Sequence, residues 1–284
     1  MMRKVKPLND FIFKKVFGEK GNEDILISFI NAVLKRTNKE PIIEIEIIDN
    51  KHLTKEVIND KTGIIDVRAR TAKGENVDIE VQLTDQGNMD KRTLFYWGKM
   101  YLENIKQGED YTSLEKVITI NILDFDYLKT ESYQSSFHLW EDIEKDYMLT
   151  DMVEIHFLEL PKFRRKKNKN YRDNAIERWL AFLEKDIPEA TLKELMDLEP
   201  AIEKAERRIE YLSSDEETMN TYWERERSLH ERANMINSAE ERGDLKRAKV
   251  AIKNMLEKGM DKDIIAEILE VDMSLVEEVL SDIQ

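Results

Sequence analysis

The sequence contains no cysteine, which excludes disulfide bonds, thiolate catalysis and any zinc site built on cysteine ligands. It has no apolar run approaching the roughly 18 residues that a membrane-spanning helix needs, so we expect no membrane partner. No apolar segment follows the basic residues near the start, so no secretory signal peptide is predicted. The few histidines are scattered without metal-ligand spacing: His52, His138, His156 and His230. Together these absences predict a cytoplasmic protein.

Positive charge is also in deficit, because 59 acidic residues outnumber 45 basic ones and give a formal net charge of −14. Such a surface repels phosphates, which argues against a protein that coats nucleic acid through bulk electrostatics. An enzyme that acts on DNA through local positive charge or a bound metal is not excluded. The strongest basic run, residues 162–169 (KFRRKKNK), predicts either a solvated loop between domains or a segment that contacts phosphates.

Two nearby segments, residues 63–66 and 78–82, alternate apolar and polar side chains with the two-residue period of half-buried strands. Gly74 between them permits the positive φ of a tight turn. If residues 72–74 form a three-residue loop, Asp66 faces Glu80 and Arg68 faces Asp78. The apolar residues of this hairpin then share the opposite, buried face: Ile65, Val67, Ile79 and Val81.

On the polar face of this hairpin, Asp66, Glu80 and Gln82 are expected to converge at one end. Carboxylate and amide oxygens suit a hard cation such as Mg²⁺, and a metal held in this way supports phosphodiester hydrolysis. The alternative is a hairpin with one solvated face and no function, since antiparallel sheets commonly expose one face. Facing acids destabilise a strand pair unless a cation or proton lies between them, which favours the metal site. Replacing either acid by alanine is then expected to leave the fold intact.

The remaining patterns predict an α/β protein with a mixed sheet and helices on its faces. Helices are expected over 11–17 (with Asn9 and Asp10 as the N-cap), 22–35 and 89–106, and strands over 43–48, 117–123, 135–140 and 152–159. The segment 117–123 is almost wholly apolar, which is typical of a central strand. In the helix over 89–106, Tyr96 and Trp97 either pack in the core or stack on a base. That helix carries the apolar residues Leu94, Trp97, Tyr101 and Leu102.

Strand patterns stop near residue 170, so we predict an α/β domain over 1–169 and a helical region over 170–284. The helical region begins with a core helix and continues with a long, highly charged helix over 214–241. Three shorter helices follow, over 245–257, 261–269 and 273–280, in the outline of a helix-turn-helix. Their acidic faces favour dimerisation or docking over DNA reading. The long helix has few apolar anchors, so we expect it to pack against a second subunit and form a homodimer.

Residues 9–18 (NDFIFKKVFG) resemble the N-terminal signature of the recombination-promoting nuclease and transposase family of the PD-(D/E)XK superfamily. The strand carrying Asp66 and the sequence Glu80-Val81-Gln82 are similar to that family's catalytic hairpin. Later segments resemble its further blocks in the same order: 92–97, 159–163, 251–256 and 264–269. The resemblance spans nearly the whole chain and is most specific over residues 9–163.

This resemblance implies a restriction-endonuclease-like core and Mg²⁺-dependent endonucleolytic cleavage of DNA, linked to recombination or to mobile-element or phage biology. It implies that Asp66 and Glu80 bind Mg²⁺ or another divalent cation such as Mn²⁺ or Ca²⁺, with the backbone carbonyl of Val81 as a third ligand. The alternative is a weakly active or non-catalytic DNA-binding or regulatory protein that keeps the nuclease fold.

By this resemblance, Gln82 occupies the position that is lysine in the superfamily motif, and glutamine is the usual residue at that position in this family. A neutral amide can hydrogen-bond the attacking water but cannot offset charge on the phosphate. Positive charge is then expected from Lys91, Arg92 or Lys99. The resemblance further implies that Asp10, at the first helix, lies near the metal.

Overall fold

The structure, a computed structural model, describes residues 5–35, 37, 40–48, 67–103, 105 and 108–283. Contacts between residues divide the chain into two units, Met1–Tyr222 and Trp223–Gln284, which are described separately. None of the helices in the described ranges is long and apolar enough to cross a membrane.

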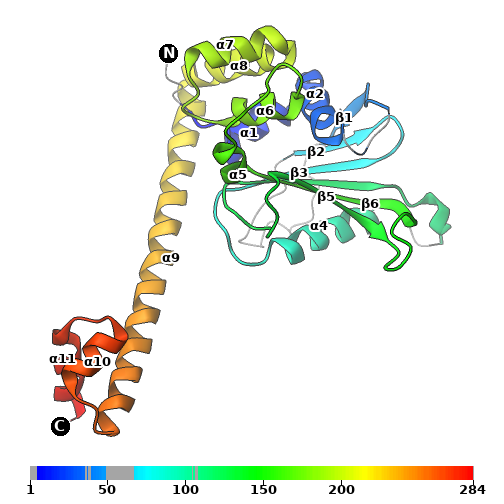
Figure 1. The fold of residues 1–284 in the computed structure, drawn as a ribbon. Coiled ribbons are helices and arrows are strands. Elements are labelled where there is room, and N and C mark those ends of the chain that lie inside the picture. Colours follow the sequence, from blue (N-terminus) through cyan, green and yellow to red (C-terminus); the bar gives the residue numbers. More distant parts are fainter. Residues whose placement is uncertain are drawn as a thin grey trace. The chain divides into compact units, whose positions relative to one another are not determined.

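The first unit is built on a sheet whose strands come from both sides of a long helix in the sequence (Figure 1). Its elements, in chain order, are α1 (Asp10–Phe17), α2 (Glu23–Leu34), β1 (Ile45–Ile47), β2 (Val67–Thr71), β3 (Asn76–Gln82), α4 (Met89–Glu103), the 3₁₀ turn η2 (Tyr111–Ser113), β4 (Val117–Leu123), β5 (Gln134–Trp140), β6 (Met148–Glu159), α5 (Leu160–Arg165), α6 (Ala175–Leu183), α7 (Glu189–Leu198) and α8 (Pro200–Ser214).

The first helix forms where its capping residues predict it. Asn9 accepts a hydrogen bond from the Phe11 N–H at 3.1 Å, which satisfies a backbone donor that the first turn leaves without an intrahelical partner. At the other end, the Gly18 N–H donates to the Lys14 carbonyl at 2.8 Å. The apolar residues between these caps are buried, so α1 is fixed on the sheet by its own amphipathic pattern.

The six described strands pair in the order β1-β2-β3-β4-β6-β5, so the sheet is mixed, as expected. β3, β4 and β6 are parallel neighbours, and the other pairs are antiparallel. In the β2–β3 hairpin Val67 pairs with Ile79 and Arg68 with Asp78, which confirms the predicted register. Gly74 in the turn has a φ of 88°, a conformation that favours glycine. β4 is buried along its whole length, which confirms its central place.

The two faces of this sheet differ in chemistry. On one face Val67, Ile79 and Val81 join a core that includes α1, α2 and α6, as their alternation predicts. Strand residues alternate between faces, so Asp78 and Glu80 lie on the other face, which α4 covers (Figure 1). That second face is therefore both polar and buried.

The apolar residues noted on α4 are only partly buried: Trp97 packs against the core, while the two leucines are exposed. Leu94 is 53% exposed and Leu102 is 66% exposed. The residues that α4 buries are Met89, Arg92, Thr93, Tyr96 and Met100. The strand face beneath α4 carries carboxylates and amides, so the helix turns polar groups toward it. The apolar side chains of Leu94 and Leu102 are therefore left exposed to solvent.

The basic run over 162–169 is part helix and part loop, and its role in contacting phosphates stays a prediction. Its first part is helix α5, in which Lys162 is 9% exposed and lies 2.7 Å from Glu159. Carboxylates also pair with the following cations: Arg164 with Asp124 and Glu184, Arg165 with Asp126, and Lys166 with Glu177. These partners offset the charge that a DNA phosphate would otherwise meet.

Helices α6 to α8 pack on α1 and α2 in the first unit. Trp179 on α6 is fully buried, with its ring 5.6 Å from that of Phe17 and 5.8 Å from that of Phe29. The division expected between residues 169 and 170 thus marks the start of all-helical sequence, whereas the division by contacts falls after Tyr222.

The second unit contains most of α9 (Glu216–Glu257), followed by α10 (Lys262–Leu269) and α11 (Met273–Ile283). The helices predicted separately over 214–241 and 245–257 are one continuous helix. Gly243 lies inside it, where glycine costs about 1 kcal/mol relative to alanine. A small core joins the three helices through Ile252, Ile265, Val276 and Val279.

Candidate active site

Three polar residues of β3 point to the same side of the sheet because they are spaced by two: Asp78, Glu80 and Gln82. Asp78 is 3% exposed and Glu80 is 2% exposed, while Gln82 at the end of the strand is half-buried. β3 lies between β2 and β4, inside the sheet. The expectation that this face is solvated and free of core contacts is therefore wrong for Glu80.

Three donors converge on the carboxylate oxygen Oε1 of Glu80. Nε of Arg92 donates to it at 2.8 Å, and Nη2 of Arg92 also contacts it. Nε2 of Gln82 donates to the same oxygen at 3.1 Å. The guanidinium of Arg92 also lies 5.2 Å from the centroid of the Tyr96 ring. A buried Glu80 is thus charge-compensated by a cation from the covering helix, as a buried carboxylate requires.

Asp78 lacks such compensation in the described structure. Burial and the neighbouring charge of Glu80 raise its pKa well above the usual range, against a weaker lowering by Arg68 and Arg92. Its Oδ1 is buried and has no hydrogen-bond partner among the described residues. Arg68, its partner across the strands, instead donates to Glu103 on α4 at 2.7 Å. The two residues are in register across the strands, as predicted, but no hydrogen bond between their side chains is described.

A hydrogen-bonded layer fixes α4 over this strand face. Oγ1 of Thr93 lies 3.2 Å from Oγ1 of Thr119 on β4, and Nδ2 of Asn121 donates to Thr93 at 3.0 Å. The same amide donates to the backbone carbonyl of His156 on β6 at 3.0 Å. Because these groups are buried, losing one partner would cost the desolvation energy of the other. The layer therefore holds α4, and with it Arg92, at a fixed place above Glu80.

The structure brings some of the sequence-predicted site residues together and leaves others apart. Glu80, Gln82 and Arg92 are in contact. Asp66 lies outside the described residues. Val81 points its side chain into the apolar core, and the role of its carbonyl stays a prediction.

The auxiliary residues lie further away along their helices. Lys91 is exposed on α4, and Lys99 is half-buried two turns later. Asp10 begins α1, which packs against the apolar face of the sheet, whereas Glu80 faces α4. Tyr96 is buried, and the partly buried Trp97 stacks on Tyr101 with ring centroids 4.9 Å apart, so both aromatic residues of the motif contribute to packing.

Asp78 is the residue that sequence reasoning missed as a site candidate. The signal was present, because its spacing of two from Glu80 places both carboxylates on one side of β3. The sequence places Asp78 opposite the basic Arg68, and only the tertiary contacts show that Arg68 turns to Glu103.

The donor set of this face fits a hard divalent cation. Asp78 and Glu80 supply carboxylate oxygens, Gln82 supplies an amide oxygen, and the buried Oδ1 of Asp78 has a lone pair without a described donor. Among the residues that the structure describes, no group of three or more His, Cys, Asp or Glu side chains is placed to hold a metal. A complete cation site would therefore need ligands in addition to these two carboxylates.

A second buried charge cluster lies on the opposite face of the sheet. Glu154 is fully buried and contacts Nζ of Lys116 at 2.6 Å, Nε2 of His156 at 2.8 Å and Oγ1 of Thr37 at 2.5 Å. Burial alone would raise the pKa of Glu154, but these three hydrogen-bond partners outweigh it and hold the pKa well below the usual range. The carboxylate is satisfied within the protein, so we assign this cluster to stability.

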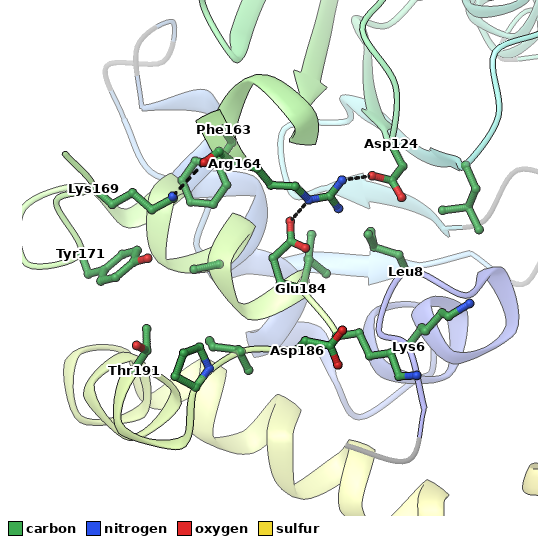
Figure 2. Close-up of a pocket in the computed structure, with 16 residues that line it drawn as sticks. Lys6, Leu8, Asp124, Phe163, Arg164, Lys169, Tyr171, Glu184, Asp186 and Thr191 are labelled. Carbon is green, nitrogen blue, oxygen red and sulfur yellow. Dashed lines mark hydrogen bonds and ion pairs between the residues drawn. The ribbon is translucent and has the colours of Figure 1, made fainter. Parts of the chain in front are cut away.

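The described structure also contains a cavity of about 680 Å³ at the carboxyl ends of β3 and β4, lined by Leu83 and Asp124 among others (Figure 2). Arg164 crosses it and bridges Asp124 at 2.5 Å and Glu184 at 2.8 Å. Neither Asp78, Glu80 nor Gln82 lines this cavity, so it is separate from the carboxylate face.

The mixed sheet with helices on both faces, and the acidic strand β3 that ends in Gln82, define an α/β protein with a buried carboxylate face. A family model described as "PD-(D/E)XK nuclease family transposase" matches residues 7–239. The match covers more than half of the chain, so the chain belongs to this family. The comparisons with curated proteins and with solved structures gave no significant match. The family indicates a nuclease or transposase-like function with DNA as substrate, and PD-(D/E)XK nucleases generally use divalent metal ions.

Proposed function

We propose that the protein is a metal-dependent DNA endonuclease that hydrolyses phosphodiester bonds in recombination or in mobile-element or phage biology. The observation that carries the proposal is the acidic face of β3, where Glu80 and Gln82 are hydrogen-bonded in a chain that belongs to a nuclease family. Asp66 and Glu80 are the proposed metal ligands, with the carbonyl of Val81 as a third. The proposed cofactor is Mg²⁺ or another divalent cation such as Mn²⁺ or Ca²⁺.

In this mechanism the chain's own residues position the reactants. Gln82 already donates to Glu80, so its amide is placed to hydrogen-bond a water beside that carboxylate. A divalent cation bound there would lower the pKa of its water and offset charge on the phosphate. Burial of the face excludes bulk solvent and strengthens these interactions. Lys91 and Lys99 on α4 are proposed to contact the DNA backbone.

We expect Glu80→Gln to abolish Mg²⁺-dependent nicking of supercoiled plasmid, because the amide keeps the shape of the side chain but loses its charge. EDTA should stop the wild-type reaction, and Asp66→Asn should behave like Glu80→Gln. Glu115→Gln is the matched control, since Glu115 pairs with Arg70 at the other end of the strand. Wild-type nicking by Glu80→Gln would overturn the site assignment.

We expect Gln82→Lys to keep or increase nicking, because the side chain is half-buried at the end of β3 and a lysine there restores the charge that other members of the superfamily use. Plasmid nicking rates at equal protein concentration measure this. A collapse of the rate with an unchanged circular dichroism spectrum would show that the amide has a hydrogen-bonding role that a cation cannot fill.

One observation favours the alternative, a weakly active or non-catalytic DNA-binding or regulatory protein that retains the nuclease fold. Glu80 is only 2% exposed and is already paired with Arg92, so it is not open to a cation as it stands. Tight DNA binding without nicking, under any divalent cation, would support this alternative. For the rest, we propose a cytoplasmic protein that forms a homodimer through its helical C-terminal region.

A further inference from the structure

Asp78 and Glu80 belong to one buried layer in which Glu80, but not Asp78, has a described hydrogen bond to a cation. The two residues are two positions apart on β3, so their Cα atoms lie about 6.6 Å apart and both side chains leave the strand on the same side. Carboxylates at this separation can reach a common ion. Each is at most 3% exposed, so water does not compensate their charge.

The buried Oδ1 of Asp78 points to a missing ligand. Most buried polar atoms have a hydrogen-bond partner, and this oxygen has none among the described residues. The residue across the strand pair does not serve it, since Arg68 donates to Glu103 and its own Nε also lacks a described partner. An oxygen with a free lone pair beside a second carboxylate is the donor arrangement that a hard cation uses.

Arg92 already shows where positive charge is required. Two of its nitrogens and the Gln82 amide converge on a single oxygen of Glu80, so that oxygen already has three donors. A divalent cation bound to Glu80 through the same oxygen would have to displace the guanidinium. Thr93, the next residue on α4, is hydrogen-bonded to the sheet, so the backbone stays in place and the Arg92 side chain would have to move.

We propose that Asp78 is a cation ligand beside Glu80, and that Arg92 holds their shared site in the metal-free protein and competes with the cation. The inference rests on the proposed function for the identity of the ion, but it assigns a ligand and a competitor that the nuclease motif does not contain. Affinity for the metal is then set partly by the strength of the Arg92–Glu80 contact.

The test measures binding of Mn²⁺ and of Ca²⁺ to the full-length protein by calorimetry and by the metal-induced rise in melting temperature, at one fixed pH. We expect Asp78→Asn to weaken binding by about 10-fold or more, since even residues that only support a ligand contribute about that much. Asparagine has the shape of the protonated acid, so the fold should be kept. Asp126→Asn is the matched control, because Asp126 pairs with Arg165 on an exposed surface.

Arg92→Gln should have the opposite effect and tighten Mn²⁺ binding by at least about fivefold, because a competing charge a few ångströms away is removed. Arg70→Gln is its control. If Arg92→Gln does not fold, Arg92→Lys is the second variant. Lysine keeps the charge but cannot contact Glu80 through two nitrogens, so this variant should still bind the metal more tightly than wild type.

Two failures are distinguishable. Wild-type Mn²⁺ affinity in Asp78→Asn, together with loss of binding in Glu80→Gln, would overturn the role of Asp78 and leave the proposed function standing. Unchanged affinity in both Arg92 variants would overturn the competition. Absence of any metal binding by the wild type and by Arg92→Gln would overturn the inference and the metal dependence of the proposed function together.

Discussion

Glu80→Ala should destabilise the protein by about 3–5 kcal/mol, the usual cost of breaking a buried ion pair by removing one partner. The substitution removes the carboxylate that accepts from Arg92, a residue only 8% exposed, and it also removes packing volume beneath α4. This expectation replaces the one from sequence alone, in which the carboxylate lay on an open polar face. Urea unfolding followed by circular dichroism measures the change.

The pattern among variants identifies the cause. Glu80→Gln retains volume and a hydrogen-bond acceptor, so its cost should be smaller than that of Glu80→Ala. Replacing both partners, Glu80→Leu with Arg92→Met, should recover much of the lost stability, because neither member of the pair is then left buried without the other. Equal stability of wild type and Glu80→Ala would show that the pair contributes nothing and that Arg92 is readily solvated.

Removal of residues 170–284 should abolish folding of the remaining chain, whereas removal of residues 223–284 should leave the first unit folded. The fragment of residues 1–169 loses α6, whose Trp179 packs against Phe17 and Phe29 in the main core. Losing a buried tryptophan alone costs about 3–5 kcal/mol, a large part of the 5–15 kcal/mol that stabilises a typical domain.

Both truncations can be compared by solubility, circular dichroism and thermal melting. Light scattering on residues 1–222 and on the full chain also tests the proposed dimer, which should form only when residues 223–284 are present. Cooperative unfolding of residues 1–169 would contradict the packing argument. A monomeric full-length protein at high micromolar concentration would contradict the subunit-joining role.

Local rules in the sequence were sufficient for α1, for β4 and for the β2–β3 register. The Asn9 cap and Gly18 fix α1, and Gly74 with the flanking alternation fixes the pairing of Arg68 with Asp78. The continuous apolar run of β4 places it in the centre of the sheet. These features depend on side chains within a few residues of one another, which is why periodicity and turn chemistry predict them.

The tertiary structure alone decided which polar groups meet and whether water reaches them. The sequence could not reveal that α4 covers the acidic strand, because that packing buries Arg92, Thr93 and Tyr96 in place of an apolar stripe. It could not reveal that Arg68 turns to Glu103 and leaves Asp78 without a described partner. Hydrogen bonds between residues far apart in the chain set these choices, and their free energy depends on burial. The sequence by itself therefore determined the strand and the acids it carries, while the fold determined their environment and their charge balance.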